Sequence, residues 1–345
     1  MKSKSIWQKL IKIFRLAPVG WSISDGDKTE GSYVHSTSIL DLSWAEDDSY
    51  LALAGGGCLP GADGSIRIID PLSKRNIKTL NAHVCGVHAL SIDPATGILA
   101  SASFDYAAHL WDLDEDDIIF LRGEDGKCKG YCEFSPQGSL LAIGEYDYYE
   151  GSHSFYIYSL SRQKNVFEHA LPLGMGVTAM GISLDGNYLA VAARDQNEQQ
   201  STHLYLVQIS SLEVVKEHVL SEDIGFYDLA FTGKGMEIVG LCNGGEAETV
   251  LHRMDAHTGA LLGTLPVGGI GGSISISPGG VELAVGSENR NITVYSTVSW
   301  SILRTYPACP EESGRLCSLA YSRDGKRLAY GLSSGIFDIL PNHAT

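Results

Sequence analysis

A short turn followed by an apolar pair recurs seven times along this chain of 345 residues. In the clearer copies the turn contains proline and then glycine, as in Asp93–Gly97 and Ser135–Gly138. Proline presets φ and glycine accepts a positive φ, so these residues favour a tight turn between two strands. The copies lie 41 to 49 residues apart when they are counted at Asp48, Gly97, Gly138, Gly186, Gly235, Gly280 and Gly325. This period predicts an array of similar units that pack against one another.

The stretch from Thr79 to Leu113 shows what one unit contains. Apolar residues alternate with others through Val87–Ile92, a second run follows the turn at Ile98–Ser103, and a third segment ends at His109–Leu113. Alternation with a period of two predicts half-buried antiparallel strands. The first strand of each unit ends on a large apolar residue, which we expect to face the neighbouring unit: Trp44, Ile92, Phe134, Ile182, Phe231, Ile276 and Tyr321. The third strands should do the same at Ile69, Trp111, Tyr158, Val207, Met254, Tyr295 and Leu340.

The same stretch resembles one repeat of the WD-repeat (β-transducin-like) family. Ala82-His83 stands where that family usually has Gly-His, and Trp111-Asp112 matches the dipeptide that closes its repeat. The resemblance is specific in this unit and depends on the turn period elsewhere, which indicates a divergent member. It implies an all-β fold, a seven-bladed β-propeller that covers roughly residues 35–340.

The end of the chain bears on how the ring closes. Five residues follow Leu340, so the seventh unit has three strands. We expect a strand within residues 17–34, at Trp21–Ile23 or at Gly31–Val34, to join the last blade, because an open sheet edge invites unwanted pairing. The predicted organisation is a basic helix at 1–16, a linker with the closing strand at 17–34, and the propeller at 35–345.

One group of polar residues in the second unit resembles a catalytic relay: His83, Ser101, Ser103, Asp105 and Trp111. In the WD-repeat family the corresponding network is structural, because its hydrogen bonds join the loop before a blade to the middle of that blade. The other units lack it. We therefore expect a structural polar network here, since buried polar groups need partners.

The net charge of −16 is unevenly placed, because residues 1–16 carry +5 and the rest of the chain −21. A propeller with this negative charge repels the phosphates of DNA and RNA. We therefore expect no nucleic acid among the partners of the propeller. No apolar run approaches the roughly 20 residues that span a bilayer, so we expect a soluble protein. Seven scattered cysteines without zinc-ligand spacing favour reduced thiols and a cytoplasmic protein.

Residues 1–16 form an amphipathic pattern. On a helix, an apolar face opposes a basic one, and the residues that we expect to dock are Lys4, Trp7, Lys9, Leu10, Ile11, Lys12, Phe14 and Arg15. This pattern is typical of a helix that lies in a membrane interface. The alternatives are docking on a partner or on the propeller, a mitochondrial transit peptide, and a structureless leader. We therefore expect a cytoplasmic protein, which is peripheral to a membrane if the helix docks there, and a mitochondrial one if residues 1–16 are a transit peptide.

The loops between the second and third strands have grown in several units. The one in the third unit contains Glu145, Tyr146, Asp147, Tyr148, Tyr149 and Glu150. Tyrosine is a frequent interface anchor, and clustered carboxylates favour a basic partner. Other acids of the same rim are Glu124, Asp125, Glu222, Asp223, Glu246, Glu248, Glu288, Glu311 and Glu312. The alternative is a solvated acidic rim with the tyrosines folded over the blade.

No catalytic motif stands out. The sequence has no Ser nucleophile elbow, P-loop or metalloprotease helix motif, and we find no repeated Asp, Glu or His at the starts of the inner strands. We therefore expect no catalytic residue, metal or cofactor, and a scaffold or adaptor that presents its rim to a basic protein or peptide. The alternative function is a propeller hydrolase of the lactonase type, with a divalent cation in the channel.

Overall fold

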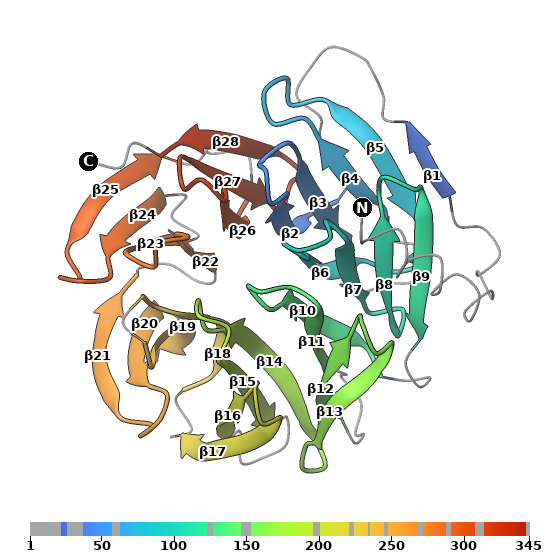
Figure 1. The fold of residues 1–345 in the computed structure, drawn as a ribbon. Helices are drawn as coiled ribbons and strands as arrows, with labels where there is room; N and C mark the ends of the chain where they lie inside the picture. The colour runs from blue at the N-terminus through green and yellow to red at the C-terminus, as the bar shows by residue number, and fades with distance from the viewer. Residues whose placement is uncertain are drawn as a thin grey trace.

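The structure, a computed structural model, describes residues 22–25, 37–56, 63–122, 127–145, 153–195, 201–220, 224–233, 235–244, 248–267, 272–287, 291–307 and 314–342. These residues form 28 β-strands and no helix. Seven antiparallel sheets stand around a common axis as the blades of a propeller (Figure 1). The predicted all-β, seven-bladed β-propeller is confirmed.

The strands follow one another from the inner to the outer edge of each blade. Blade 1 contains β2 (Ile39–Trp44), β3 (Leu51–Gly55), β4 (Ile66–Ile69) and β5 (Asn76–Asn81), with β1 (Ser22–Asp25) added outside β5. Blade 2 contains β6 (Val87–Ile92), β7 (Leu99–Ser103), β8 (Ala107–Asp112) and β9 (Asp117–Arg122). Blade 3 contains β10 (Lys129–Phe134), β11 (Leu140–Glu145), β12 (Ser154–Ser159) and β13 (Lys164–Ala170).

The remaining four blades repeat this order. Blade 4 contains β14 (Met175–Ile182), β15 (Tyr188–Asp195), β16 (Thr202–Gln208) and β17 (Glu213–Leu220). Blade 5 contains β18 (Phe226–Phe231), β19 (Glu237–Gly244), β20 (Glu248–Asp255) and β21 (Leu261–Pro266). Blade 6 contains β22 (Gly272–Ile276), β23 (Glu282–Ser287), β24 (Asn291–Ser296) and β25 (Ile302–Pro307), and blade 7 contains β26 (Leu316–Tyr321), β27 (Arg327–Leu332) and β28 (Phe337–Pro341).

The turn that sets the repeat has the same backbone conformation in all seven blades. The turn position has a positive φ of 58° at Asp48 and of 68° to 78° at the six glycines that occupy it in the other blades. Glycine reaches this region without steric cost, whereas an aspartate there strains the backbone. The recurrence of glycine in the sequence therefore reflects a conformational requirement.

The core lies between the blades. Trp44, Trp111 and Phe231 are at most 2% exposed, and they belong to clusters that combine strands of neighbouring blades. Of the fourteen residues predicted to face a neighbouring blade, Ile276 and Leu340 are half-buried and the other twelve are buried. Burying one large apolar side chain stabilises the fold by about 1.5–3 kcal/mol, so each blade depends on its neighbours.

The strand near the N-terminus does not join blade 7, where the first of the two predicted closing segments was expected. β1 pairs antiparallel with β5, with Ser22 opposite Asn81 and Asp25 opposite Lys78, so it extends blade 1 and not blade 7. The prediction that Trp21–Ile23 closes the ring is therefore wrong, because β1 pairs with the outer strand of blade 1 and blade 7 has three described strands. The other alternative, Gly31–Val34, lies outside the described residues and stays a prediction.

Side chains join blade 7 to blade 1. The indole N–H of Trp44 donates to the carbonyl of Ala320 (3.0 Å), and the Ser318 hydroxyl donates to the carbonyl of Ile39 (3.3 Å). Phe337 and Ala329 of blade 7 pack in one buried cluster with apolar residues of blade 1. These contacts hold the first and last described blades together.

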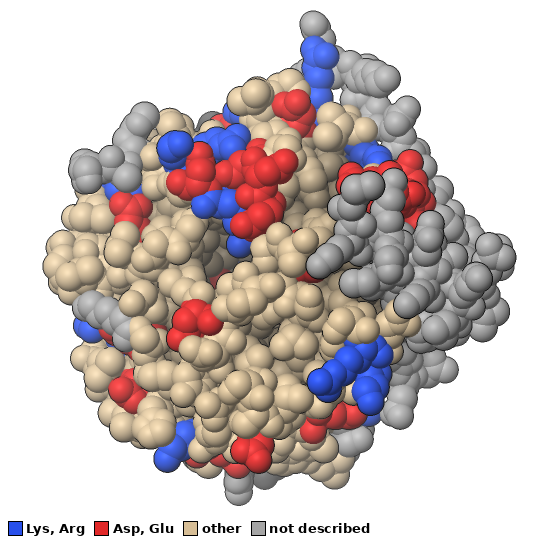
Figure 2. Space-filling model, in the orientation of Figure 1, with Lys and Arg blue, Asp and Glu red and all other residues tan. Residues whose placement is uncertain are grey.

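Asp48 has a special part in this seam. Its carboxylate accepts the backbone N–H groups of Arg323 (2.7 Å) and Asp324 (2.9 Å) from the corresponding turn of blade 7. Arg327 stacks over the Trp44 ring at 4.7 Å. The face shown in Figure 2 carries a cluster of acidic and basic side chains over this seam. Blade 1 thus has Asp48 where the other blades have glycine. Its positive φ is less favourable than that of glycine, but its carboxylate forms two hydrogen bonds with blade 7.

No helix long and apolar enough to cross a membrane occurs in the described part of the chain. The predicted helix at residues 1–16 lies outside it.

Replacing Asp48 should weaken the seam. Asp48→Ala removes both hydrogen bonds to blade 7, and we expect it to lower the free energy of unfolding by about 2–3 kcal/mol. Asp48→Gly should cost less, because glycine relaxes the positive φ. Urea unfolding of both variants is the measurement. Asp47→Ala is the control, because the carboxylate of Asp47 bonds to Ser49 of its own turn. A loss as large in the control would contradict the seam account.

Candidate functional site: the central channel and the rim

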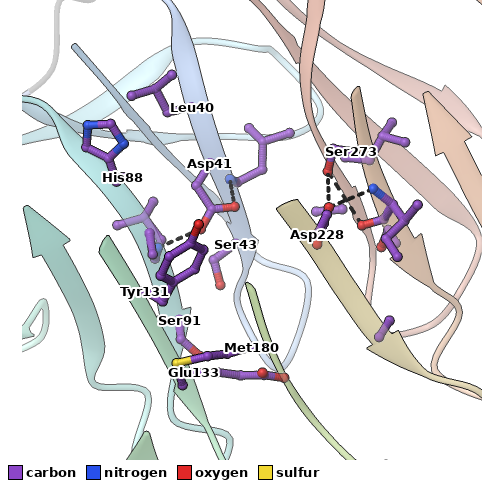
Figure 3. A pocket seen from close by; sticks show the side chains of 18 of the residues that line it. Leu40, Asp41, Ser43, His88, Ser91, Tyr131, Glu133, Met180, Asp228 and Ser273 are labelled. Carbon is purple, nitrogen blue, oxygen red and sulfur yellow. Dashed lines mark hydrogen bonds between the residues drawn. The ribbon is translucent and has the colours of Figure 1, made fainter. Parts of the chain in front are cut away.

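The inner strands surround a channel on the propeller axis. Its volume is about 640 Å³, and residues of β2, β6, β10, β14, β18, β22 and β26 line it. Figure 3 shows Asp41, Glu133 and Asp228 on opposite sides of this opening, with His88 towards one end and Met180 towards the other. The channel is therefore polar on its wall and open to water.

Asp41 and Asp228 occupy the same position in their blades, three residues before the large apolar residue that ends the inner strand. Each carboxylate accepts one N–H from its own strand and one from the next blade. For Asp41 the second donor is Leu90 (2.6 Å), and for Asp228 it is Ile274 (2.8 Å). These two side chains clamp blade 1 to blade 2 and blade 5 to blade 6.

Glu133 clamps blade 3 to blade 4 in a different way. It stands immediately before Phe134, and its Oε2 accepts the N–H of Ile182 (3.0 Å). No hydrogen bond within the described part of the chain involves Oε1, which is left to the channel (Figure 3). Glu133 thus differs from the two aspartates, whose oxygens both accept N–H groups.

Serine fills the position of Glu133 in three other blades, as Ser43, Ser91 and Ser275, and two of these hydroxyls accept an N–H of the next blade. The hydroxyl of Ser91 accepts the N–H of Phe134 (2.9 Å), and that of Ser275 accepts the N–H of Tyr321 (3.1 Å). Side chains of the inner strands thus satisfy backbone donors across most of the seams, as buried N–H groups require.

Burial raises the pKa of all three channel carboxyls. It raises the pKa of Asp41 to about 7 and that of Asp228 to about 6, against the opposing effect of the N–H donors. Burial likewise raises the pKa of Glu133 to about 8. The Ile182 N–H and the charge of Arg323 oppose this rise, and the charges of Asp228 and Asp41 add to it. These three carboxyls therefore gain or lose protons between about pH 6 and pH 8.

The sequence pattern did not single out these carboxylates. Asp41 and Asp228 are each the third residue of their inner strand, so one position is repeated in two blades. The signal was available: aligning the strands on Trp44 and Phe231 superposes the two residues. It was weak, because the position holds Asp in two blades of seven.

An aromatic pair lies beside the channel. The rings of His88 and Phe104 stack with centroids 3.7 Å apart. Burial lowers the pKa of His88 to about 4, so its imidazole is neutral at physiological pH. This pair adds a flat apolar surface and no positive charge.

The polar group of blade 2 comes together as a network. Nδ1 of His83 lies 2.9 Å from Asp105, Nε2 lies 2.8 Å from Ser101, and the Trp111 indole donates to the same serine (2.9 Å). The Ser103 hydroxyl donates instead to the carbonyl of Gly86 (2.9 Å). The His83 side chain is wholly buried, so the network offers no face to a substrate.

The predicted contact loop of blade 3 is only partly described. Glu145 is 4% exposed and makes an ion pair with the buried Lys129, and its other oxygen accepts the N–H and the hydroxyl of Ser154 (both 2.9 Å). Glu145 therefore ties together the two ends of the loop and presents little surface to a partner. Tyr146–Glu150, and the side chains of the other rim acids, lie outside the description.

Comparison with known proteins points to one kind of repeat. A family model described as "WD domain, G-beta repeat" matches residues 28–70 and 74–112. WD repeat-containing protein 1 of Gallus gallus is 25% identical over 312 residues, which cover 78% of this chain and 49% of that protein. WD repeat-containing protein 90 of Mus musculus is 24% identical over 277 residues, which cover 77% of this chain and 14% of that protein. The chain thus spans about half the length of the first relative and 14% of the length of the second.

Solved structures agree on the architecture. The hydrazine synthase of Kuenenia stuttgartiensis superposes with a TM-score of 0.72 over 93% of this chain and 100% of that chain, at 15% identity. At this identity the likeness concerns the fold alone.

The raised pKa of Glu133 gives a prediction for stability against pH. A carboxyl whose pKa rises on folding stabilises the fold when protonated, and this contribution disappears as pH increases through about 8. Glu133→Gln keeps an oxygen for the N–H of Ile182 and cannot ionise. We expect it to exceed the wild type in unfolding free energy by about 1–2 kcal/mol at pH 9, since channel water screens part of the shift.

Urea unfolding between pH 5 and pH 9 measures this difference. The advantage of Glu133→Gln should shrink as pH falls, and Glu213→Gln, an exposed residue of β17, should show no such trend. An advantage that is independent of pH would contradict proton uptake by Glu133.

Proposed function

Because the chain is a divergent member of the WD-repeat family, we propose that it is a non-catalytic scaffold that binds protein partners, and that its acidic, Tyr-rich rim receives a basic protein or peptide. The observation that carries this proposal is the ring of seven blades, whose antiparallel strands are the scaffold on which the loops begin and end. Loops on such a scaffold are frequent recognition surfaces.

The root of the blade 3 loop supports the rim as the binding surface. The buried pair of Lys129 and Glu145, together with Ser154, fixes both ends of the segment that contains Tyr146, Tyr148 and Tyr149. A fixed root lowers the entropy lost when a loop binds, and tyrosines are favoured anchors at interfaces. The charge of −21 outside residues 1–16 attracts a basic partner and speeds its approach.

The proposal of a non-catalytic protein has its own support. Both relatives are named for their repeat and not for a reaction. Among the described residues, no three His, Cys, Asp or Glu side chains are placed to hold a metal ion. The alternative, a lactonase-type hydrolase, needs a divalent cation in the channel, so stoichiometric metal in the purified, folded protein would favour it.

The tyrosines provide the first test. We expect the triple change Tyr146→Ala, Tyr148→Ala and Tyr149→Ala to weaken binding of a mapped partner by about 2–4 kcal/mol, the range of interface hot spots. Isothermal titration with the purified partner is the measurement. The matched control changes the same residues to Phe, which keeps the rings. Equal affinity in the Ala variant and the wild type would remove these tyrosines from the interface.

We propose a second role for residues 1–16, which dock the propeller on an anionic membrane surface. Their sequence opposes Trp7, Leu10, Ile11 and Phe14 to five cations. β1 adds support, because its pairing with β5 ties the chain that follows this segment to the outer edge of blade 1 (Figure 1). The protein would then be cytoplasmic and peripheral to a membrane. Docking of this segment on a protein partner and a mitochondrial location, with residues 1–16 as a transit peptide, are the alternatives.

Vesicle co-sedimentation tests this role. Full-length protein should pellet with phosphatidylserine vesicles and stay in solution with phosphatidylcholine vesicles, because the segment carries +5. Protein without residues 1–16 should stay in solution with both. Equal pelleting of the two proteins would refute the membrane role, and an intact mass lacking the segment in mitochondria would favour the transit peptide.

A further inference from the structure

Blades 5 and 6 carry an apolar surface that the rest of the described structure leaves uncovered. Twelve large hydrophobic side chains are exposed among the described residues, and half of them belong to these two blades: Leu261, Leu262, Val281, Val298, Ile302 and Leu303. The other six are spread over blades 1, 2 and 4 and the loops between blades. Single exposed apolar residues are ordinary, whereas a concentration of them marks an interaction surface.

These side chains lie at one end of their blades. Leu261 and Ile302 are the first residues of the outer strands β21 and β25, directly after the turns from β20 and β24, and a leucine follows each of them. The turn that contains Val281 joins β22 to β23 at the same end, because neighbouring strands are antiparallel. The carbonyl of Val281 accepts the N–H of Thr297 (3.0 Å), so the turn that contains Val298 lies beside it.

Trp300 joins the two blades of this surface. Its half-buried ring and Leu265 of β21 pack against the same buried cluster, and the guanidinium of Arg253 from blade 5 lies 4.2 Å from the ring. Trp300 has a positive φ of 59°, at the turn position where blade 5 has Gly259. Strain of this kind is concentrated at functional surfaces. We call the six exposed residues around Trp300 the blade 5–6 patch; its outer strands, β21 and β25, are on the left of Figure 1.

The patch is poor in charge. Ala256–Val281 is the longest stretch of the sequence without Asp, Glu, Lys or Arg, and Asn291–Leu303 also has none. Figure 2 shows mostly uncharged side chains over blades 5 and 6, in contrast to the charged cluster over the seam of blades 7 and 1. Charges on an outer strand usually prevent its pairing with another chain. β17 contains Glu213, Lys216 and Glu217, whereas β21 contains no charged residue and lacks this protection.

This chemistry favours a second copy of the chain as the partner. A basic protein or an anionic membrane would need free charges, yet the two guanidinium groups beside the patch are already paired, Arg253 with Glu237 (2.7 Å) and Arg304 with Glu282 (2.5 Å). In a two-fold dimer a surface faces its own copy, so charged residues near the axis repel one another. An acidic surface of this chain, whose net charge is −16, would repel its copy, whereas the patch would not.

The size of the patch fits such a contact. Its six residues are 43% to 64% exposed, so together they offer roughly 500 Å² of apolar surface. A standard interface buries about 800 Å² of each partner, and about 65% of a homodimer interface is apolar. The patch therefore matches the apolar part of such an interface. We propose that the blade 5–6 patch is the interface of a symmetric homodimer of this chain.

Sedimentation equilibrium of the full chain at micromolar concentrations tests the dimer. The wild type should give twice the 37.1 kDa of one chain. Ile302→Glu brings a carboxylate from each copy into the interface, and we expect it to raise the dissociation constant of the dimer about hundredfold. Added salt should strengthen the wild-type dimer, because it screens the repulsion between two acidic chains. Circular dichroism and thermal unfolding check that the variant keeps its fold.

Two controls separate the patch from other surfaces. Leu72→Glu places the same charge on an apolar side chain of blade 1 that is 87% exposed, and it should leave the dimer intact. Removal of residues 1–16 should also leave it intact. A dimer lost on this removal would show that the segment, and not the patch alone, makes the contact, and would overturn the proposal.

A monomeric wild type would overturn the proposal, as would a dimer that Ile302→Glu leaves unchanged. A monomeric wild type that pellets with phosphatidylcholine vesicles, while Ile302→Glu stays in solution, would assign the patch to lipid instead. The rim is judged separately, because the Ala variants of Tyr146, Tyr148 and Tyr149 should remain dimers.

Discussion

Each blade of this propeller has two apolar faces and can bury neither alone. The large residues that end the inner strands, such as Trp44 and Phe231, are covered by the preceding blade, so the core lies in the seams between blades. This constraint explains why seven sheets of different sequence keep one spacing and one turn conformation. It also makes ring closure decisive, because an open seam between blades 7 and 1 would expose one such face on each side.

The polar groups follow the same logic. The inner strand of each blade is an edge strand that faces the channel, so no neighbouring strand pairs with the N–H groups along that edge. Side chains of the preceding blade accept hydrogen bonds from several of these N–H groups. Asp41, Glu133 and Asp228 do this as carboxylates, and Ser91 and Ser275 do it as hydroxyls. The need to accept these N–H groups thus places three carboxyls in a channel of about 640 Å³. Unlike serine hydroxyls, carboxyls with raised pKa values gain or lose protons near neutral pH.

The sequence predicted the architecture because turns and apolar periodicity are local signals that repeat seven times. It predicted the residues of the blade 2 network because the resemblance supplied their spacing. It did not place β1, since a strand of four residues has no preference of its own between the edges of blade 1 and blade 7. It also missed the channel acids and the burial of Glu145, because Lys129, its partner, lies in another strand and nothing local indicates that the two meet.

The central claim is that all seven blades form one closed ring held by these seams. Hydrogen–deuterium exchange on the full chain, resolved by peptide, tests it most directly. The account predicts that amides of β2 and β26, on the two sides of the closing seam, exchange as slowly as those of β10 and β18. Exchange of β2 and β26 within minutes, while the other inner strands stay protected for hours, would show that the ring is open and would contradict the account.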